Sequence, residues 1–180
     1  MNQSAVKRMQ VIAVDMDGVL SDTVEQFISW EERETGRRKS MEEIIGKPEI
    51  EALPNSRKYV FTPGFFRTAQ VVKDSQDILC RLYKKYEVYI VSAATEFPQS
   101  LSEKIDWLNE FFPFIPWQRI VLCGSKEIVR ADIMIDDHFK NLNHFKGESS
   151  LLYTQPHNAL AEIGRHRRVH DWQEIANILL

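Results

Sequence analysis

The sequence has little of what marks the special classes of protein. Its 180 residues include only two cysteines, Cys80 and Cys123, which argues against a disulfide framework and suits a reducing compartment. Glycine and proline number seven each, too few for a fibrous or low-complexity chain. No apolar stretch approaches the ~20 residues that span a bilayer, and residues 1–10 lack the features of a signal peptide. We therefore expect a cytoplasmic protein with no membrane partner.

Neither sign of charge dominates, because 23 basic residues stand against 26 acidic ones and the net charge is −3. No segment is basic enough to form an electrostatic surface for DNA or RNA. The one dense basic run, Arg165-His166-Arg167-Arg168, is interpreted as a solvated surface patch. Hydrophobic residues make up 43% of the chain and charged residues 27%, which is typical of one globular domain with room for a modest insertion.

Five short apolar runs are too brief for helices and suit buried parallel strands. They are Val11–Val14, Val88–Val91, Ile120–Leu122, Ile133–Ile135 and Leu151–Tyr153. Between these runs, apolar residues return at helical spacing. This alternation predicts an α/β protein, with a three-layer α/β/α, Rossmann-like core and a mostly parallel sheet.

The interval 21–62 breaks the alternation, since it holds no convincing apolar strand. We expect a small helical cap there, inserted after the first strand into a core made of residues 1–20 and 63–180. Such an insertion hangs over the carboxyl ends of the strands, where open α/β sheets bind their ligands.

Two pairs of residues have the spacing of a capping box, in which a hydroxyl and a carboxylate satisfy backbone groups at the start of a helix. They are Ser40 with Glu43 and Ser100 with Glu103. We expect a helix to begin at each pair.

Polar side chains follow the predicted strands at the point where each strand ends. They are Asp15-Met16-Asp17-Gly18 after the first strand, Ser92 after the second, Lys126 four residues after the third, and Asp136-Asp137 after the fourth. Because the carboxyl ends of parallel strands meet at one edge of a sheet, these groups converge there. Carboxylates, a hydroxyl and an ammonium are suited to holding a phosphate beside a divalent cation.

The carboxylates account for both the metal and the proton chemistry. Mg²⁺ prefers oxygen ligands in octahedral geometry, which Asp15 with Asp136 or Asp137 can supply. The cation lets an anionic carboxylate approach an anionic phosphoryl group. A carboxylate so placed can act as the nucleophile, while Asp17 can protonate the leaving oxygen and later activate water.

Three further residues complete this hypothesis. Lys126 can neutralise charge on the phosphoryl oxygens, the Ser92 hydroxyl can donate a hydrogen bond to one of them, and Gly18 permits the turn that brings the loop close to a ligand. Each feature alone has a plain structural explanation, such as a turn, a helix cap or a solvated lysine. Their occurrence together, each at or shortly after a strand end, favours a phosphate site.

The same residues resemble a family. Asp15-Met16-Asp17-Gly18-Val19-Leu20 resembles the first motif of the haloacid dehalogenase-like phosphatases, and Ser92, Lys126 and Asp136-Asp137 match the other three motifs in order. Within that superfamily the chain is similar to the 5′(3′)-deoxyribonucleotidases over nearly its whole length. The supporting stretches are Asp15 to Asp22, Pro63-Gly64-Phe65-Phe66, Val88 to Ser92 and Asp132 to Asp137.

The resemblance implies a Mg²⁺-dependent phosphomonoesterase that hydrolyses deoxynucleoside monophosphates through an aspartyl-phosphate intermediate. It implies that Asp15 is the nucleophile and that Asp17 is the general acid and base, with its carbonyl on Mg²⁺. It also implies that Ser92 and Lys126 bind the phosphate.

The remaining implied residues hold the metal and the substrate. The resemblance implies that the acidic pair completes the metal site; of the two, we expect Asp137 to coordinate the ion directly and Asp136 to act through water. The cap covers the base and sugar of the nucleotide, and Phe65 and Phe66 flank the nucleobase, since bases stack well on aromatic faces.

Two departures from the family pattern bear on substrate choice. Ala93 stands where better-known members carry a second hydroxyl residue, and Thr23 stands where they tend to have an aromatic residue near the base. The five histidines show no metal-ligand spacing, and His138, which follows the acidic pair, is interpreted as a surface or packing residue.

Alternatives from other classes stay open. A signalling receiver module also gathers Asp, Ser/Thr and Lys on a parallel sheet, but it keeps its acidic pair on the first strand and its phosphorylated Asp in the middle. A catalytically silent nucleotide-binding relative is disfavoured by the intact Asp15 and Asp17. A phosphatase of another small phosphomonoester, such as a sugar phosphate, is the alternative within the enzymes. Nothing in the sequence indicates an oligomeric state.

Overall fold

A single six-stranded sheet forms the centre of the protein, seen here in a computed structural model that describes residues 8–180. Residues 1–7 of the predicted core lie outside this range. The strand order is β3-β2-β1-β4-β5-β6, and every pairing is parallel. The strands are β1 (Val11–Val14), β2 (Glu87–Ser92), β3 (Ile120–Leu122), β4 (Ile133–Asp136), β5 (Ser149–Tyr153) and β6 (Arg167–Val169). The predicted α/β class with a mostly parallel sheet is confirmed.

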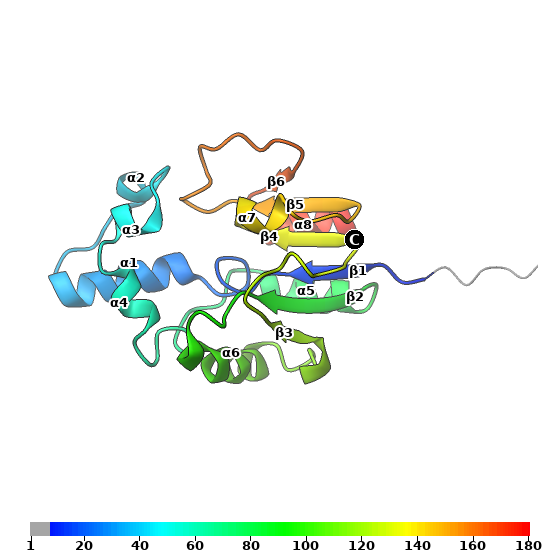
Figure 1. Ribbon diagram of the computed structural model, residues 1–180, viewed down its shortest axis with the longest axis horizontal. Coiled ribbons are helices and arrows are strands. Elements are labelled where there is room, and N and C mark those ends of the chain that lie inside the picture. The colour runs from blue at the N-terminus through cyan, green and yellow to red at the C-terminus, as the bar shows by residue number, and fades with distance from the viewer. Residues whose placement is uncertain (1–7) are drawn as a thin grey trace, which may run out of the picture.

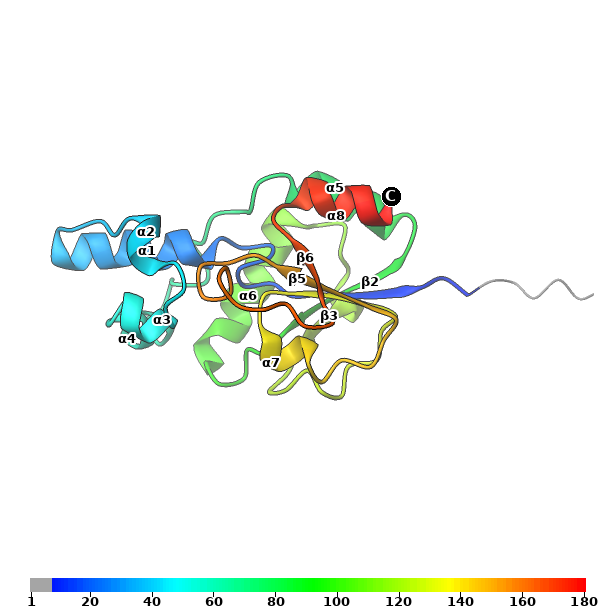
Figure 2. The ribbon, with the colours of Figure 1, turned by 90° about the horizontal axis from the view of Figure 1, so that it is seen from above.

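Helices cover both faces of this sheet (Figures 1 and 2). They are α5 (Ser75–Tyr83), α6 (Pro98–Phe111), the 3-10 helix η1 (Trp117–Arg119), α7 (Phe139–Leu142) and α8 (Trp172–Leu179). Side chains of β1 alternate between two hydrophobic clusters: Ile12 and Val14 pack with residues of α5, α6 and α8, while Ala13 packs with Leu142 of α7. This period of two on a strand covered on both faces gives the three layers.

The helices between β1 and α5 gather beyond the carboxyl ends of the strands, at one end of the molecule (Figure 1). They are α1 (Thr23–Thr35), α2 (Met41–Ile44), α3 (Glu49–Ala52) and α4 (Ser56–Val60). Their apolar side chains form a separate hydrophobic cluster, which includes Phe27, Ile28, Tyr59, Phe65 and Phe66. A backbone hydrogen bond of 2.8 Å from Gly46 to the carbonyl of Pro156 ties this group to the sheet layer.

Only one of the two predicted capping boxes forms. Ser40 and Glu43 form the capping box at the start of α2, where the Ser40 amide donates to Oε2 of Glu43 at 3.0 Å. The prediction for Ser100 and Glu103 is wrong, because α6 already begins at Pro98. The Ser100 hydroxyl donates to the carbonyl of Ala94, and Glu103 accepts hydrogen bonds from another segment of the chain.

The interpretation of the basic run as a solvated patch is also wrong in part, because β6 begins within the run, at Arg167. His166 is buried and contacts Ser150 and Asn143 at 2.7 and 2.9 Å. Arg168 donates to the side-chain and backbone oxygens of Asn158. A three-residue edge strand with two arginines and one valine lacks the apolar run that marks the other strands, so the sequence did not reveal it. No helix within residues 8–180 is both long and apolar enough to cross a membrane.

The different burial of two leucines predicts different losses of stability when each is replaced by alanine. Leu79 of α5 is fully buried, whereas Leu160 is 76% exposed. We expect Leu79→Ala to lower the free energy of unfolding by about 2–5 kcal/mol and Leu160→Ala to lower it by about 0.5 kcal/mol or less. Urea denaturation measures both values, and equal losses would contradict this packing.

Candidate active site

The loop after β1 places two carboxylates at the carboxyl edge of the sheet. The Asp15 amide donates to the carbonyl of Ile135 at 2.9 Å, which continues the β1–β4 pairing to the start of the loop. The chain then turns at Gly18, which has a φ of 74°. A Cβ atom at Gly18 would lie 2.6 Å from Oδ2 of Asp137. The left-handed backbone and the close approach of the Asp137 side chain both favour glycine here.

A buried ion triad joins three strand ends. The ammonium of Lys126, in the loop after β3, lies 2.6 Å from Oδ1 of Asp15 and 2.6 Å from Oδ2 of Asp136. All three side chains are buried. The sequence-predicted strand-end residues therefore do come together, and Lys126 contacts two carboxylates rather than lying in solvent.

The two members of the acidic pair have different surroundings. Asp136 is saturated by the protein: its Oδ1 accepts the His138 amide at 2.9 Å, and the Asn141 side chain donates to both of its oxygens. Asp137, by contrast, has a buried Oδ1 with no hydrogen-bond partner within residues 8–180. A buried, unsatisfied carboxylate oxygen is costly. Of the carboxylate oxygens of Asp136 and Asp137, Oδ1 of Asp137 is thus the one that most needs a ligand.

Three carboxylates, from Asp15, Asp136 and Asp137, offer oxygens that lie within 4.8 Å of one another. Burial raises the pKa of Asp15 to about 8; Lys126 opposes this shift, and the charges of Asp136 and Asp137 add to it. Burial and the charge of Asp136 also raise the pKa of Asp137 well above its usual range. A hard divalent cation would relieve this crowding of negative charge, and an all-oxygen donor set fits Mg²⁺.

Asp17 lies beside this triad and is held by a second lysine. Its Oδ2 accepts from the Ser92 hydroxyl at 3.3 Å and forms an ion pair with Lys104 of α6. The Lys104 ammonium also donates to Oγ of Ser92 at 2.9 Å. Lys104 was not predicted as a site residue, although its spacing of three and four residues from Trp107 and Leu108 places it on the buried face of α6.

A cavity of about 520 Å³ opens beside these groups. On the sheet side it is lined by Asp15, Asp17, Lys126 and Asp137, and on the helical side by Thr23, Val24, Phe27, Glu49 and Arg57. Its walls therefore combine a charged end at the strand edge with a mixed apolar and polar end at the inserted helices.

The two phenylalanines predicted to flank a base differ in position. Phe66 lines the cavity, and its ring stacks on Phe97 with centroids 6.1 Å apart. Phe65 is fully buried and packs against Phe27 and Trp30, with centroids 4.6 and 5.3 Å away. Phe65 is thus placed behind Phe66 rather than among the residues that line the cavity.

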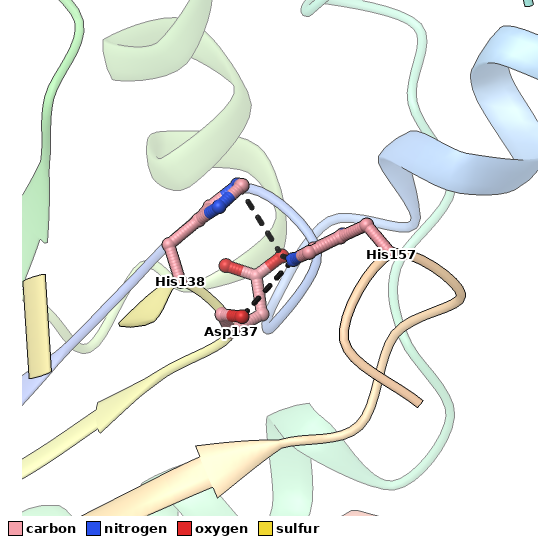
Figure 3. A group of neighbouring side chains, drawn as sticks. All are labelled: Asp137, His138 and His157. Atoms are coloured by element: carbon pink, nitrogen blue, oxygen red, sulfur yellow. Dashed lines mark hydrogen bonds and ion pairs between the residues drawn. The ribbon is translucent and has the colours of Figure 1, made fainter. Parts of the chain in front are cut away.

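Two histidines stack beside Asp137 (Figure 3). The rings of His138 and His157 have centroids 4.3 Å apart and planes 14° apart. Lone pairs lie in the ring planes, so two nearly parallel rings cannot both point at one ion. Nε2 of His157 also lies 3.0 Å from the Asp137 carbonyl, which can only accept. This pair packs at the site but is a poor metal ligand set, and burial together with His138 lowers the pKa of His157 to about 4.

The ion triad predicts a pH-dependent loss of stability in Lys126→Met. Removing the ammonium leaves Asp15 and Asp136 buried and unpaired, so we expect the free energy of unfolding to fall by about 3–5 kcal/mol at alkaline pH without divalent cations. The pKa of Asp15 is already raised to about 8 in the wild type, where Lys126 opposes the shift, so without Lys126 the folded variant takes up this proton at a higher pH than the folded wild type does. The loss should therefore be largest near about pH 10 and shrink as the pH falls to about 8.

Urea denaturation across this range measures the effect. Lys73→Met, at an exposed lysine, is the control and should change stability little at any pH. A loss in Lys126→Met that is independent of pH would contradict the assignment of the triad.

Comparisons with known proteins agree with this site. The family model for 5′ nucleotidase, deoxy (pyrimidine), cytosolic type C protein matches residues 8–180. The 5′(3′)-deoxyribonucleotidases of Bacillus subtilis (strain 168) and of Bacillus phage SPbeta are each 40% identical over 174 residues, which cover 95% of this chain and 99% of the relative.

Solved structures extend the similarity to the fold. A haloacid dehalogenase-like hydrolase from Streptococcus pneumoniae superposes with a TM-score of 0.65 at 16% identity, covering 96% of this chain and 99% of that one. An L-2-haloacid dehalogenase has a TM-score of 0.59 at 12% identity, covering 96% and 100%. The resemblance found in the motifs is confirmed: the chain belongs to the 5′(3′)-deoxyribonucleotidase family of phosphomonoester hydrolases, on a haloacid dehalogenase-like fold.

Proposed function

We propose that the protein is a Mg²⁺-dependent 5′(3′)-deoxyribonucleotidase that hydrolyses deoxynucleoside monophosphates through a phosphorylated Asp15. The observation that carries this proposal is the position of the Asp15 carboxylate, which lines the cavity and lies 2.6 Å from a buried ammonium. An anionic nucleophile needs cationic surroundings before an anionic phosphate can approach it. Lys126 supplies part of that charge.

In the first step, a carboxylate oxygen of Asp15 forms a bond to phosphorus while the bond from phosphorus to the sugar oxygen breaks. The departing oxygen keeps the bonding electrons and takes a proton from Asp17, so that the nucleoside leaves as a neutral alcohol. Ser92 and Lys126 bind the oxygens of the phosphoryl group during transfer.

In the second step, a water oxygen attacks the phosphorus of phospho-Asp15 and gives its proton to Asp17. The bond between phosphorus and the Asp15 oxygen breaks, its electrons return to the carboxylate, and inorganic phosphate leaves. Asp17 is then protonated again, so the two steps together consume one water and restore the site.

Asp15, Asp137 and the backbone carbonyl of Asp17 would hold Mg²⁺, with Asp136 acting through water. The unsatisfied Oδ1 of Asp137 and the saturated oxygens of Asp136 support this division. When bound, the cation supplies charge neutralisation and Lewis acidity at the phosphate. The residues of the chain provide the nucleophile and the proton transfers.

Residues 21–62 form the cap in this proposal, on a core made of residues 1–20 and 63–180. The cavity volume of about 520 Å³ lies within the range of small-molecule sites. Phe66 offers an aromatic wall for the nucleobase, and Phe65 supports it from behind. Thr23 and Ala93, the two departures from the family pattern, also line the cavity, so they bear on which base and sugar are accepted.

A cytoplasmic location is also part of the proposal. Cys80 and Cys123 are both free thiols. Unpaired cysteines suit a reducing compartment.

Hydrolysis assays test the proposed reaction. We expect the protein to release phosphate from dUMP or dTMP faster than from ribonucleotides or sugar phosphates, measured as kcat/KM across the panel. Asp15→Asn should lower kcat at least about 10³-fold, because an amide is a poor nucleophile. Preference for a sugar phosphate would overturn the substrate assignment, and full activity in Asp15→Asn would overturn the nucleophile.

Divalent cation should be needed for both activity and part of the stability. Chelation with EDTA should abolish hydrolysis and added Mg²⁺ should restore it. Because a ligand that binds the folded state stabilises it, Mg²⁺ should also raise the melting temperature of the protein. Asp137→Asn should lose this rise, whereas the control Asp77→Asn, at an exposed residue of α5, should keep it. An equal rise in both variants would exclude Asp137 as a ligand.

A further inference from the structure

We propose that Lys104 is a positioning residue for Asp17: it fixes one oxygen of that carboxylate so that the other carries the proton in both steps. This inference rests on the proposed function. It concerns a lysine outside the four family motifs, on a helix rather than at a strand end.

Lys104 is only 1% exposed, an unusual position for an ammonium. Burying a charge is expensive unless it is paired and hydrogen-bonded. The ammonium of Lys104 has three partners: the Asp17 carboxylate, the Ser92 hydroxyl at 2.9 Å, and the Phe66 ring, whose centroid lies 4.5 Å away. Within residues 8–180, Asp17 is the one acidic side chain that pairs with it. The burial of this ammonium is therefore explained by its contacts with Asp17, Ser92 and Phe66.

The contacts of Asp17 are unequal at its two oxygens. Oδ2 accepts from both Lys104 and Ser92, while Oδ1 is buried and has no partner within the described residues. The terminal torsion of an aspartate is soft and permits rotation of the carboxylate. An ammonium held against Oδ2 stops that rotation, which leaves Oδ1 as the oxygen free to give and take a proton.

The helix that carries Lys104 is itself clamped on both sides of this residue. Glu103 accepts the amide hydrogens of Gly64, Phe66 and Arg67 at 2.6, 3.1 and 3.1 Å. Four residues further on, the indole of Trp107 donates to the carbonyl of Ala69 at 2.8 Å. These bonds fix the rotation of α6 about its axis, so Lys104 is directed at Asp17 by the same contacts that hold the segment carrying Phe66.

Steady-state kinetics with p-nitrophenyl phosphate and dUMP test this role. Lys104→Met keeps the apolar stem and removes the charge. We expect kcat to fall about 10- to 100-fold, a part of what a general acid and base contributes, with KM and the inhibition constant of inorganic phosphate changed less than about threefold. Lys84→Met, at an exposed lysine, should match the wild type. An unchanged kcat with weaker phosphate inhibition would overturn the proposal and make Lys104 a phosphate ligand.

A double-mutant cycle with Asp17→Asn separates positioning from a general structural effect. If Lys104 acts through Asp17, Lys104→Met should cause no further loss of kcat in the Asp17→Asn background. Additive losses would overturn the proposal. Lys104→Gln, which keeps a hydrogen-bond donor, replaces Lys104→Met in the cycle if circular dichroism shows that the methionine variant does not fold.

The same assays distinguish this inference from the proposed function. A wild-type protein inactive on p-nitrophenyl phosphate and on all nucleotides would overturn the proposed function together with this role. An active wild type with additive or absent effects at Lys104 would overturn the positioning role alone.

Discussion

The ion triad of Asp15, Lys126 and Asp136 is the interaction on which the rest of the site depends. Its two ion pairs, each with a distance of 2.6 Å, join side chains that are almost fully buried. Its members are brought together by the parallel sheet, because they lie at the ends of β1 and β4 and in the loop after β3. The sheet thus places a carboxylate that lines the cavity against a buried positive charge.

The inserted helices and the second lysine make use of this arrangement. The helices pack around their own apolar cluster and close one side of the cavity. Lys104 brings a second buried positive charge to the site, at Asp17. Two buried ammonium groups and a divalent cation would explain how a chain with a net charge of −3 accepts an anionic substrate.

Much of this account follows from the sequence because the site residues stand at the ends of apolar strands. Five strands and the convergence of Asp15, Ser92 and Lys126 could be predicted from that local pattern alone. The strand β6 could not, because arginines at a sheet edge carry no apolar periodicity. Lys104 and His157 were also missed, since helical spacing and loop sequence do not say which distant side chain a residue meets. Local sequence patterns do not predict contacts between segments that are far apart in the chain.

The most direct test of the central claim is detection of phosphate on Asp15. Asp17→Asn, which lacks the base for the second step, should accumulate the intermediate when it is mixed with Mg²⁺ and p-nitrophenyl phosphate and quenched in acid. Mass spectrometry should then find one phosphoryl group, on the peptide that contains Asp15, and none in Asp15→Asn. An active wild-type enzyme with no phosphoryl group on Asp15, or with the group on another residue, would contradict the account.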